Sequence, residues 1–269
     1  MNSTTEHVVH YCDARTGLGS LEPGSVALIV TSPPYPMVEM WDETWADDEG
    51  EIAAALETGD GSRAFRLMLS SLEPIWRECK RVLCPGGIAA INIGDATRST
   101  GSRFALYPTH AFLITCFSDL GFQSLPGLLW AKSTNSPAKF MGSGVSPPNA
   151  YVTLEHEHIL LFRNGGPREF PAGSPEHERR DESCYFWEER NQWFSDHWEI
   201  QGERQSLAPG AGRTRSAAYP FEVAYRLIQM YSVKGDLVLD PFLGTGTTTL
   251  AALASERSSY GFEITHSLQ

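Results

Sequence analysis

The sequence VALIVTSPPY, residues 26–35, joins five apolar residues to a pair of consecutive prolines. An uninterrupted apolar run of this length predicts a buried strand of a parallel sheet. Proline fixes φ and has no backbone N–H, so Ser32-Pro33-Pro34-Tyr35 predicts a stiff, extended turn at the end of that strand. The strand therefore leads into a rigid set of hydrogen-bond acceptors beside an aromatic ring.

Strand-like and helix-like segments alternate along most of the chain. Apolar runs predict strands at 7–11, 26–30, 88–94, 128–131, 158–162, 237–239 and 259–263. Apolar residues at three- and four-residue steps predict helices at 63–83, 107–120, 220–232 and 247–256. This alternation predicts an α/β fold with a doubly wound, Rossmann-like and mostly parallel sheet. Residues 95–103, DATRSTGSR, are interpreted as a loop.

The alternation breaks between residues 132 and 219. Clusters of proline and glycine there surround the strand at 158–162 and a block rich in aromatic and charged residues. Such a composition indicates an inserted recognition region.

The composition is that of a single large α/β domain without a membrane segment. The chain has 269 residues, of which 41% are hydrophobic, and no apolar run is long enough to span a bilayer. The five cysteines show no CxxC spacing, so neither a disulfide framework nor a zinc knuckle is predicted. We therefore expect a cytoplasmic protein with no membrane partner.

The net charge of −12 does not argue against a nucleic-acid partner, because the acids are concentrated in one segment. Residues 36–62 contain nine acidic residues and no Lys or Arg, which leaves a charge of only −3 for the rest of the chain. We interpret this acidic segment as a solvated loop and helix face.

A second motif, Asp240-Pro241-Phe242-Leu243-Gly244-Thr245-Gly246, follows one predicted strand and opens a helix. Two glycines one residue apart let the backbone turn sharply against a ligand, and Glu263 ends the next strand. This arrangement suits a nucleoside. No Lys-Ser/Thr pair follows, so it is not a P-loop, and the third glycine of the dinucleotide fingerprint is missing.

Together, TSPPY and DPFLGTGTT resemble the amino-directed DNA methyltransferases of the β type. GSVALIVTSPPY, ECKRVLCPGGIAAINIGD, EHEHILLFRN and the stretch from AAYPFEVAYRLIQMY to DPFLGTGTT look like blocks of that family. Their order is circularly permuted, with the catalytic motif before the cofactor motif. Ser32 favours the branch that methylates N4 of cytosine, since the adenine-N6 enzymes usually carry Asp at that place.

The resemblance implies S-adenosylmethionine as the cofactor and assigns roles along the chain. Residues 1–131 would hold the catalytic part, 132–219 the target-recognition region, and 220–269 the cofactor-binding part. Ser32 and the Pro33 carbonyl would accept the two N–H bonds of the target amine, Pro34 would stiffen the turn, and Tyr35 would stack on the flipped-out base. The implied cofactor-binding residues are Asp13, Thr31, Asp240, Pro241, Phe242, Gly244, Thr245, Gly246 and Glu263. Asp13 is nearly as well explained as a capping residue at the end of the first strand.

Double-stranded DNA is the implied partner, together with a cognate restriction endonuclease in a prokaryotic restriction-modification system. Family members of this type often form homodimers, and the sequence leaves the oligomeric state open. Candidate DNA contacts are Arg98, Arg103, Lys132, Arg213 and Arg215, each equally well explained as an ordinary solvated cation. His156 and His158 share one face of a predicted strand, but no third ligand is evident, so no metal site is predicted.

Three other hypotheses remain open. An adenine-N6 DNA methyltransferase would have the same fold. A catalytically silent DNA-binding module would keep the fold without turnover, although the intact motifs argue against it. A protein-glutamine methyltransferase would usually carry Asn in place of Ser32 and follow the unpermuted order.

The leading hypothesis requires a particular geometry. The proline turn and the glycine turn, which are remote in sequence, must meet at neighbouring carboxyl ends of one sheet.

Overall fold

The computed structural model describes residues 5–48, 50–132, 143–202 and 218–265. Within them, eight strands form one sheet. In spatial order the strands are β1 (His7–His10), β10 (Ser258–Phe262), β9 (Leu237–Asp240), β2 (Val26–Thr31), β3 (Leu83–Ile93), β7 (His156–Arg163), β6 (Gln123–Ala131) and β8 (His197–Glu199). All neighbours pair in parallel except at β7, which runs antiparallel to β3 and β6. The predicted mostly parallel α/β sheet is confirmed.

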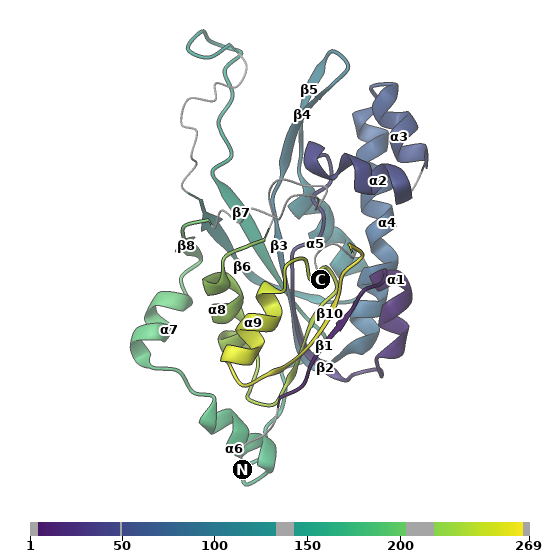
Figure 1. Ribbon diagram of the computed structural model, residues 1–269. Helices are drawn as coiled ribbons and strands as arrows, with labels where there is room; N and C mark the ends of the chain where they lie inside the picture. Colours follow the sequence, from purple (N-terminus) through teal and green to yellow (C-terminus); the bar gives the residue numbers. More distant parts are fainter. Residues whose placement is uncertain (1–4, 49, 133–142, 203–217, 266–269) are drawn as a thin grey trace.

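Helices cover both faces of this sheet (Figure 1). One face packs against α4 (Gly61–Val82) and α5 (Thr109–Asp119), and the other against α8 (Phe221–Tyr231) and α9 (Thr247–Ala254). The strand β2 is buried along its whole length because it serves both cores. Ile29 packs on the α4 side, whereas Leu28 and Val30 pack on the α8 side. The continuous apolar run in the sequence reflects this double burial.

Helix α4 shows the predicted apolar stripe and runs through Pro74. Its N-terminus is capped by Asp60, whose carboxylate accepts a hydrogen bond from the backbone N–H of Arg63 at 3.0 Å. The buried side chains at three- and four-residue steps are Ala64, Phe65, Met68, Leu72, Ile75, Trp76, Cys79 and Val82. This stripe fixes α4 against the sheet directly beneath the strand ends that carry the motifs.

Shorter elements surround this central sandwich. Around the first face lie α1 (Ala14–Gly17), η1 (Leu18–Ser20), η2 (Glu39–Trp41), α2 (Asp42–Asp48) and α3 (Gly50–Glu57). In the segment before α8 lie α6 (Pro175–Glu182) and α7 (Trp187–Trp193). The region from 132 to 219 contributes β7 and β8 to the same sheet as the rest of the chain. No helix in the described ranges is long and apolar enough to cross a membrane.

The structure differs from the sequence interpretation at three strand regions, one of which is β6, which begins at Gln123 rather than at residue 128. Residues 95–103 are not a loop: β4 (Ala96–Thr100) and β5 (Arg103–Tyr107) form an antiparallel hairpin that projects beyond the sheet (Figure 1). Gly101, at φ +59°, makes its turn. The strand expected at 88–94 begins already at Leu83, because Gly86, at φ +79°, and a register shift let the Pro-Gly-Gly stretch stay paired.

The hairpin packs closely against the first residue of α4, and this contact generates a prediction. A Cβ on Gly61 would lie 2.5 Å from the Thr100 hydroxyl and closer still to the Tyr107 hydroxyl. Gly61→Ala is therefore expected to destabilise the fold by about 1–3 kcal/mol, as overpacking does. Gly50→Ala, at the start of α3, would meet nothing within 4 Å and serves as the matched control. Equal free energies of unfolding in urea for the two variants would contradict the close packing.

Candidate active site

The two sequence motifs meet at the carboxyl ends of β2 and β9, as the resemblance requires. These strands are parallel neighbours, with Leu28 opposite Val238 and Ile29 opposite Leu239. At their ends the Thr31 hydroxyl donates a hydrogen bond to Asp240 Oδ1 at 2.5 Å, across 209 residues of sequence. The proline turn and the glycine turn consequently open into the same space.

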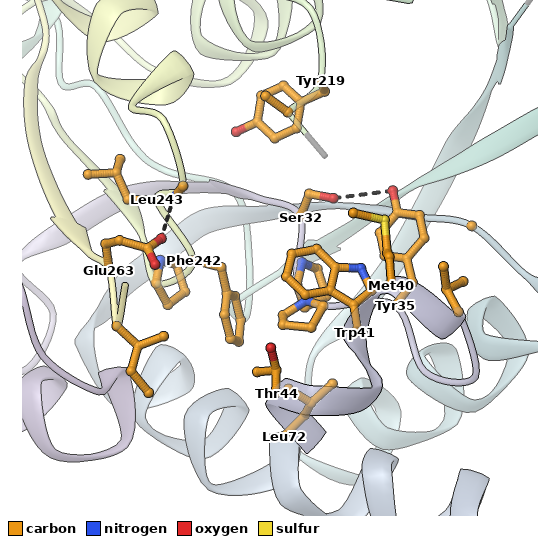
Figure 2. A pocket seen from close by; sticks show the side chains of 18 of the residues that line it. Ser32, Tyr35, Met40, Trp41, Thr44, Leu72, Tyr219, Phe242, Leu243 and Glu263 are labelled. Carbon is orange, nitrogen blue, oxygen red and sulfur yellow. Dashed lines mark hydrogen bonds between the residues drawn. The ribbon is translucent and has the colours of Figure 1, made fainter. Parts of the chain in front are cut away.

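That space is a cavity of about 810 Å³ (Figure 2). Its volume falls in the range of pockets that hold nucleoside-sized ligands, roughly 300–1,000 Å³. Eleven of the residues singled out in the sequence line it: Asp13, Ser32, Pro33, Pro34, Tyr35, Lys132, Pro241, Phe242, Gly244, Thr245 and Glu263. Thr31 and Asp240 are buried behind the wall, and Gly246 is the N-terminal cap of α9.

The glycine turn forms one end of the cavity. Gly244 and Gly246 have φ values of +56° and +85°, in the left-handed region that favours glycine. The bend brings the backbone N–H of Gly244 to Glu263 Oε2 at 2.8 Å (Figure 2), and the N–H of Thr265 donates to Oε1 at 2.7 Å. Each carboxylate oxygen thus retains acceptor capacity toward the cavity, as the hydroxyls of a ribose would need.

Asp240 is fully partnered beneath the floor of the site. Its Oδ1 accepts hydrogen bonds from Thr31 and from the backbone N–H of Phe242 at 3.0 Å, and its Oδ2 accepts from Thr248 and from the Tyr219 hydroxyl at 3.3 Å. Burial raises the pKa of Asp240 to about 6, against the lowering effect of these four donors. The carboxylate therefore stabilises the junction of the two motifs at a desolvation cost.

Asp13 has both of the roles that the sequence left open, that of a cavity residue and that of a capping residue. It lines the cavity, and it also caps α1, accepting from the backbone N–H of Arg15 at 2.7 Å. Burial alone would raise the pKa of Asp13, but the hydrogen bonds and charge of Arg15 outweigh burial and lower it. Its carboxylate is thus ionised and held by Arg15 at the cavity edge.

The proline turn forms the other end of the cavity, where Ser32 and Tyr35 join a hydrogen-bonded chain. Ser32 Oγ donates to the Tyr35 hydroxyl at 3.2 Å, and that hydroxyl donates to Glu157 Oε2 at 2.8 Å (Figure 2 shows the first bond). Asn92 Nδ2 donates to both the Tyr35 oxygen and Glu157 Oε2, at 2.8 and 2.7 Å. Lys132 forms an ion pair with Glu157 Oε1.

Burial, together with the nearby charge of Glu157, raises the pKa of Tyr35 well above its usual value. The phenol therefore stays protonated at any ordinary pH. Gly94 leaves room for the ring, since a Cβ there would lie 2.9 Å from Tyr35 Cε2. The Tyr35 ring is thus fixed in place both at its hydroxyl and along its edge.

Part of the cavity wall comes from a segment whose role the sequence analysis missed. Figure 2 shows Trp41, Thr44 and Leu72 along the side of the cavity opposite Tyr219. Trp41 and Thr44 belong to the acidic segment 36–62, in which five of the six acids whose side chains the structure describes are exposed, as predicted. Several of its apolar side chains turn inward instead: Trp45 is 3% exposed and Ile52 is fully buried. Trp41 and Trp45 were the sequence signal for this role, but the nine acids around them led us to interpret the whole segment as solvated.

Three of the candidate DNA contacts lie in the described part of the chain. Arg98 is paired through both terminal nitrogens with Asp42, at 2.7 and 2.6 Å, so it braces the hairpin against α2. Lys132 is engaged by Glu157, and Arg103 is exposed at the start of β5. Arg213 and Arg215 lie outside the described residues. A role in DNA binding stays a prediction for all five.

His158 of β7 does have neighbours that could share a metal ion with it, which the sequence did not reveal. Ligand atoms of Asp95, His110 and His158 lie within 4.8 Å of one another. The two imidazole rings, however, are stacked, with centroids 4.0 Å apart and planes 17° from parallel. Each ring directs its lone pair within its own plane, so nearly parallel rings cannot both ligate one ion. The cluster is better described as an Asp95–His110 hydrogen bond of 2.7 Å with His158 stacked on it.

Comparison with known proteins agrees with this geometry. The chain matches the model of a DNA methylase family over residues 26–268, and it belongs to that family of N6- and N4-directed enzymes. It is 52% identical over 267 residues to the type II methyltransferase M.MthZI of Methanothermobacter thermautotrophicus, covering 98% of this chain and 75% of that protein. It is 48% identical over 277 residues to the type II methyltransferase M.MjaI of Methanocaldococcus jannaschii, covering 99% and 89%.

Solved structures show the same fold. TTHA0409 of Thermus thermophilus, in complex with S-adenosyl-L-methionine, superposes with a TM-score of 0.71 at 32% identity, over 96% of this chain and 88% of that one. The cytosine-N4-specific PvuII DNA methyltransferase superposes with a TM-score of 0.62 at 17% identity, over 97% and 83%. At that identity the second likeness concerns the fold alone.

The buried carboxyl of Asp240 yields a prediction about pH and stability. Its pKa is about 6 in the folded protein and near the ordinary value of 3.8 when unfolded, so the folded state binds more protons between these values. Its contribution to stability is present below pH 4 and is lost as the pH rises through 6, by on the order of 2–3 kcal/mol. Asp240→Asn removes the titration, and its amide can donate to the hydroxyls that now donate to Oδ2.

The measurement is the free energy of unfolding in urea for both proteins, without cofactor, from pH 4 to pH 7. The wild type is expected to lose stability relative to Asp240→Asn as the pH rises. A difference that stays constant, or that changes in the opposite direction, would contradict the raised pKa.

Proposed function

We propose that this DNA methylase transfers a methyl group from S-adenosylmethionine to the exocyclic N4 of cytosine in duplex DNA. The observation that carries the proposal is the position of the Ser32 hydroxyl. It lines the same cavity as Glu263 and Gly244, which lie on neighbouring parts of one sheet edge. An acceptor for an amine and a carboxylate suited to a ribose therefore face a common space.

S-adenosylmethionine fits the glycine end of the cavity. The open backbone at Gly244 and Gly246 would admit its methionine end, and Glu263 would accept its ribose hydroxyls. Phe242, on the Glu263 side, and Trp41, below Ser32 in the view, supply apolar surface to the cavity (Figure 2). When bound, this cofactor supplies an electrophilic methyl group on a sulfonium. The complex of TTHA0409 with the same molecule supports this assignment.

Ser32 and Pro33 would activate the target amine. The lone pair of an exocyclic amine is delocalised into the ring of the base, which makes the nitrogen a poor nucleophile. The Ser32 hydroxyl and the Pro33 carbonyl would each accept one N–H bond and draw the nitrogen toward a pyramidal geometry. The fixed φ of the prolines holds both acceptors in position, so alignment contributes to the rate.

Tyr35 would receive the base once it has left the duplex. The cavity lies within the strand ends, so a paired base cannot reach Ser32 without flipping out of the helix. The Tyr35 ring is held at its hydroxyl and can stack on an inserted base. The type II methyltransferases among the relatives support a restriction-modification role, with a cognate endonuclease that reads the same DNA sequence.

The choice of cytosine generates a prediction about the product. The adenine-N6 enzymes of this family usually carry Asp where this chain has Ser32. We therefore expect N4-methylcytosine as the product. Nucleosides from DNA incubated with the protein and S-adenosylmethionine would be analysed by mass spectrometry. N6-methyladenine alone would contradict the cytosine assignment and leave the amino-methyltransferase assignment standing, whereas no methylated base at all would contradict both.

The role of Ser32 generates a second prediction. Ser32→Ala is expected to lower single-turnover methyl transfer by about 10²–10³-fold, the usual loss when one aligned hydrogen-bond partner of a reacting group is removed. Its affinity for the cofactor should be unchanged, because Ser32 lies at the other end of the cavity from Glu263. Ser118→Ala, on the exposed side of α5, is the matched control. Wild-type turnover in Ser32→Ala would show that this hydroxyl is not an essential acceptor.

A further inference from the structure

We propose that Glu157 is a positioning residue, which acts through Tyr35 to make the Ser32 hydroxyl a hydrogen-bond acceptor toward the target base. This inference rests on the proposed function of Ser32 and concerns a residue on β7, well away from both motifs in the sequence.

A serine is an ambiguous acceptor. Its hydroxyl can donate one hydrogen bond or accept two, whereas an aspartate in the same place can only accept. If Ser32 turned its hydrogen toward the cavity, it would confront the N–H bonds of the amine with another donor. A serine site therefore needs a hydrogen-bond acceptor on the side away from the base, to which the serine hydroxyl donates its hydrogen.

The chain of hydrogen bonds behind Ser32 provides this acceptor. The Glu157 carboxylate can only accept, so the Tyr35 hydroxyl must donate to it, at 2.8 Å. With its own hydrogen used, the Tyr35 oxygen can only accept from Ser32, at 3.2 Å. The Ser32 hydrogen consequently points away from the base, and the remaining lone pairs of Oγ face the cavity.

Two further donors keep this direction from reversing. Asn92 Nδ2 donates to Glu157 Oε2 at 2.7 Å and to the Tyr35 oxygen at 2.8 Å. Lys132 pairs with Glu157 Oε1, and its ammonium lies 4.3 Å from the centroid of the Trp130 ring. The side chain of Glu157 is only 13% exposed. These partners of the carboxylate are all donors, and they fix the polarity of the chain from Lys132 to Ser32.

This polarity selects the chemical class of the base. An amino group presents N–H donors to the Ser32 lone pairs and is accepted. A keto oxygen, as in thymine or uracil, would place an acceptor against an acceptor in a largely buried site, which is strongly unfavourable. Glu157, which lines the cavity beside Tyr35, therefore contributes to the choice of amino-bearing over keto-bearing bases through Tyr35 and Ser32.

The test compares substitutions that separate polarity from shape. Glu157→Gln is nearly isosteric, but its amide has one acceptor oxygen where the carboxylate has two, so its NH2 donor must face either Lys132 or the donors of Tyr35 and Asn92. Glu157→Asp is shorter and keeps the carboxylate. A role in polarity predicts that Glu157→Asp retains more single-turnover methyl transfer than Glu157→Gln, which should lose about 10²-fold. A role in packing alone predicts the reverse order and would overturn the proposal.

A double-mutant cycle tests whether Glu157 acts through Tyr35. Tyr35→Phe removes the link, so adding Glu157→Gln to it should cause little further loss, whereas independent roles would multiply the two losses and contradict the proposal. Glu178→Gln, exposed on α6, is the matched control. Should Glu157→Gln not fold, Glu157→Asn against Glu157→Asp gives the same comparison at equal length.

Cofactor affinity, measured by calorimetry, is expected to be unchanged in all these variants, because the glycine end is untouched. Wild-type transfer by Glu157→Gln would overturn this inference and leave the proposed function intact. Absence of methyl transfer to any DNA base by the wild type, with cofactor bound, would overturn both.

Discussion

The parallel pairing of β2 with β9 is the constraint on which the site depends. It brings together two turns separated by 209 residues, and the hydrogen bond from Thr31 to Asp240 joins them at the last residue of each strand. The crossover from β2 to β3 runs through α4 on one face, whereas the crossover from β9 to β10 runs through α9 on the other. The connections thus diverge between β2 and β9, and a crevice opens at the carboxyl ends where they part. The cavity is a consequence of this topology rather than of any one side chain.

Because the crevice is lined by strand ends, its chemistry is set by largely buried polar groups in and behind its wall. Asp240 and Glu157 are both held by several donors; Asp240 lies behind the wall, and Glu157 is part of the wall beside Tyr35. In a medium of low dielectric constant a satisfied network is rigid, and an unsatisfied one is costly. Ser32 therefore takes its orientation from Tyr35 and Glu157, and Thr31 at the end of β2 takes its own from Asp240.

Much of this arrangement could be predicted from the sequence, because local patterns determine it. The apolar runs of β2 and β9, the stripe of α4 and the two turn motifs each carry their own signal within about twenty residues. The hairpin of β4 and β5 was missed because TRSTGSR has the composition of a loop, and its pairing is supported by contact with Gly61.

The role of Glu157 was missed for another reason. Its contact with Tyr35 follows from the antiparallel register that sets Asn92 opposite Ile159 and Ile93 opposite His158, and no local pattern encodes such a register.

The use of serine rather than aspartate has a further electrostatic consequence. An aspartate would place its negative charge directly on the reacting amine. Here the acceptor at the amine is neutral, the Glu157 carboxylate lies behind the Tyr35 hydroxyl, and Lys132 balances that carboxylate. The charge is thus removed from the reacting atoms, while its directing effect is transmitted through two hydroxyl groups. Such transmission depends on the orientation of each hydroxyl: the Glu157 carboxylate sets that of Tyr35, and the Tyr35 oxygen then accepts the hydrogen of Ser32.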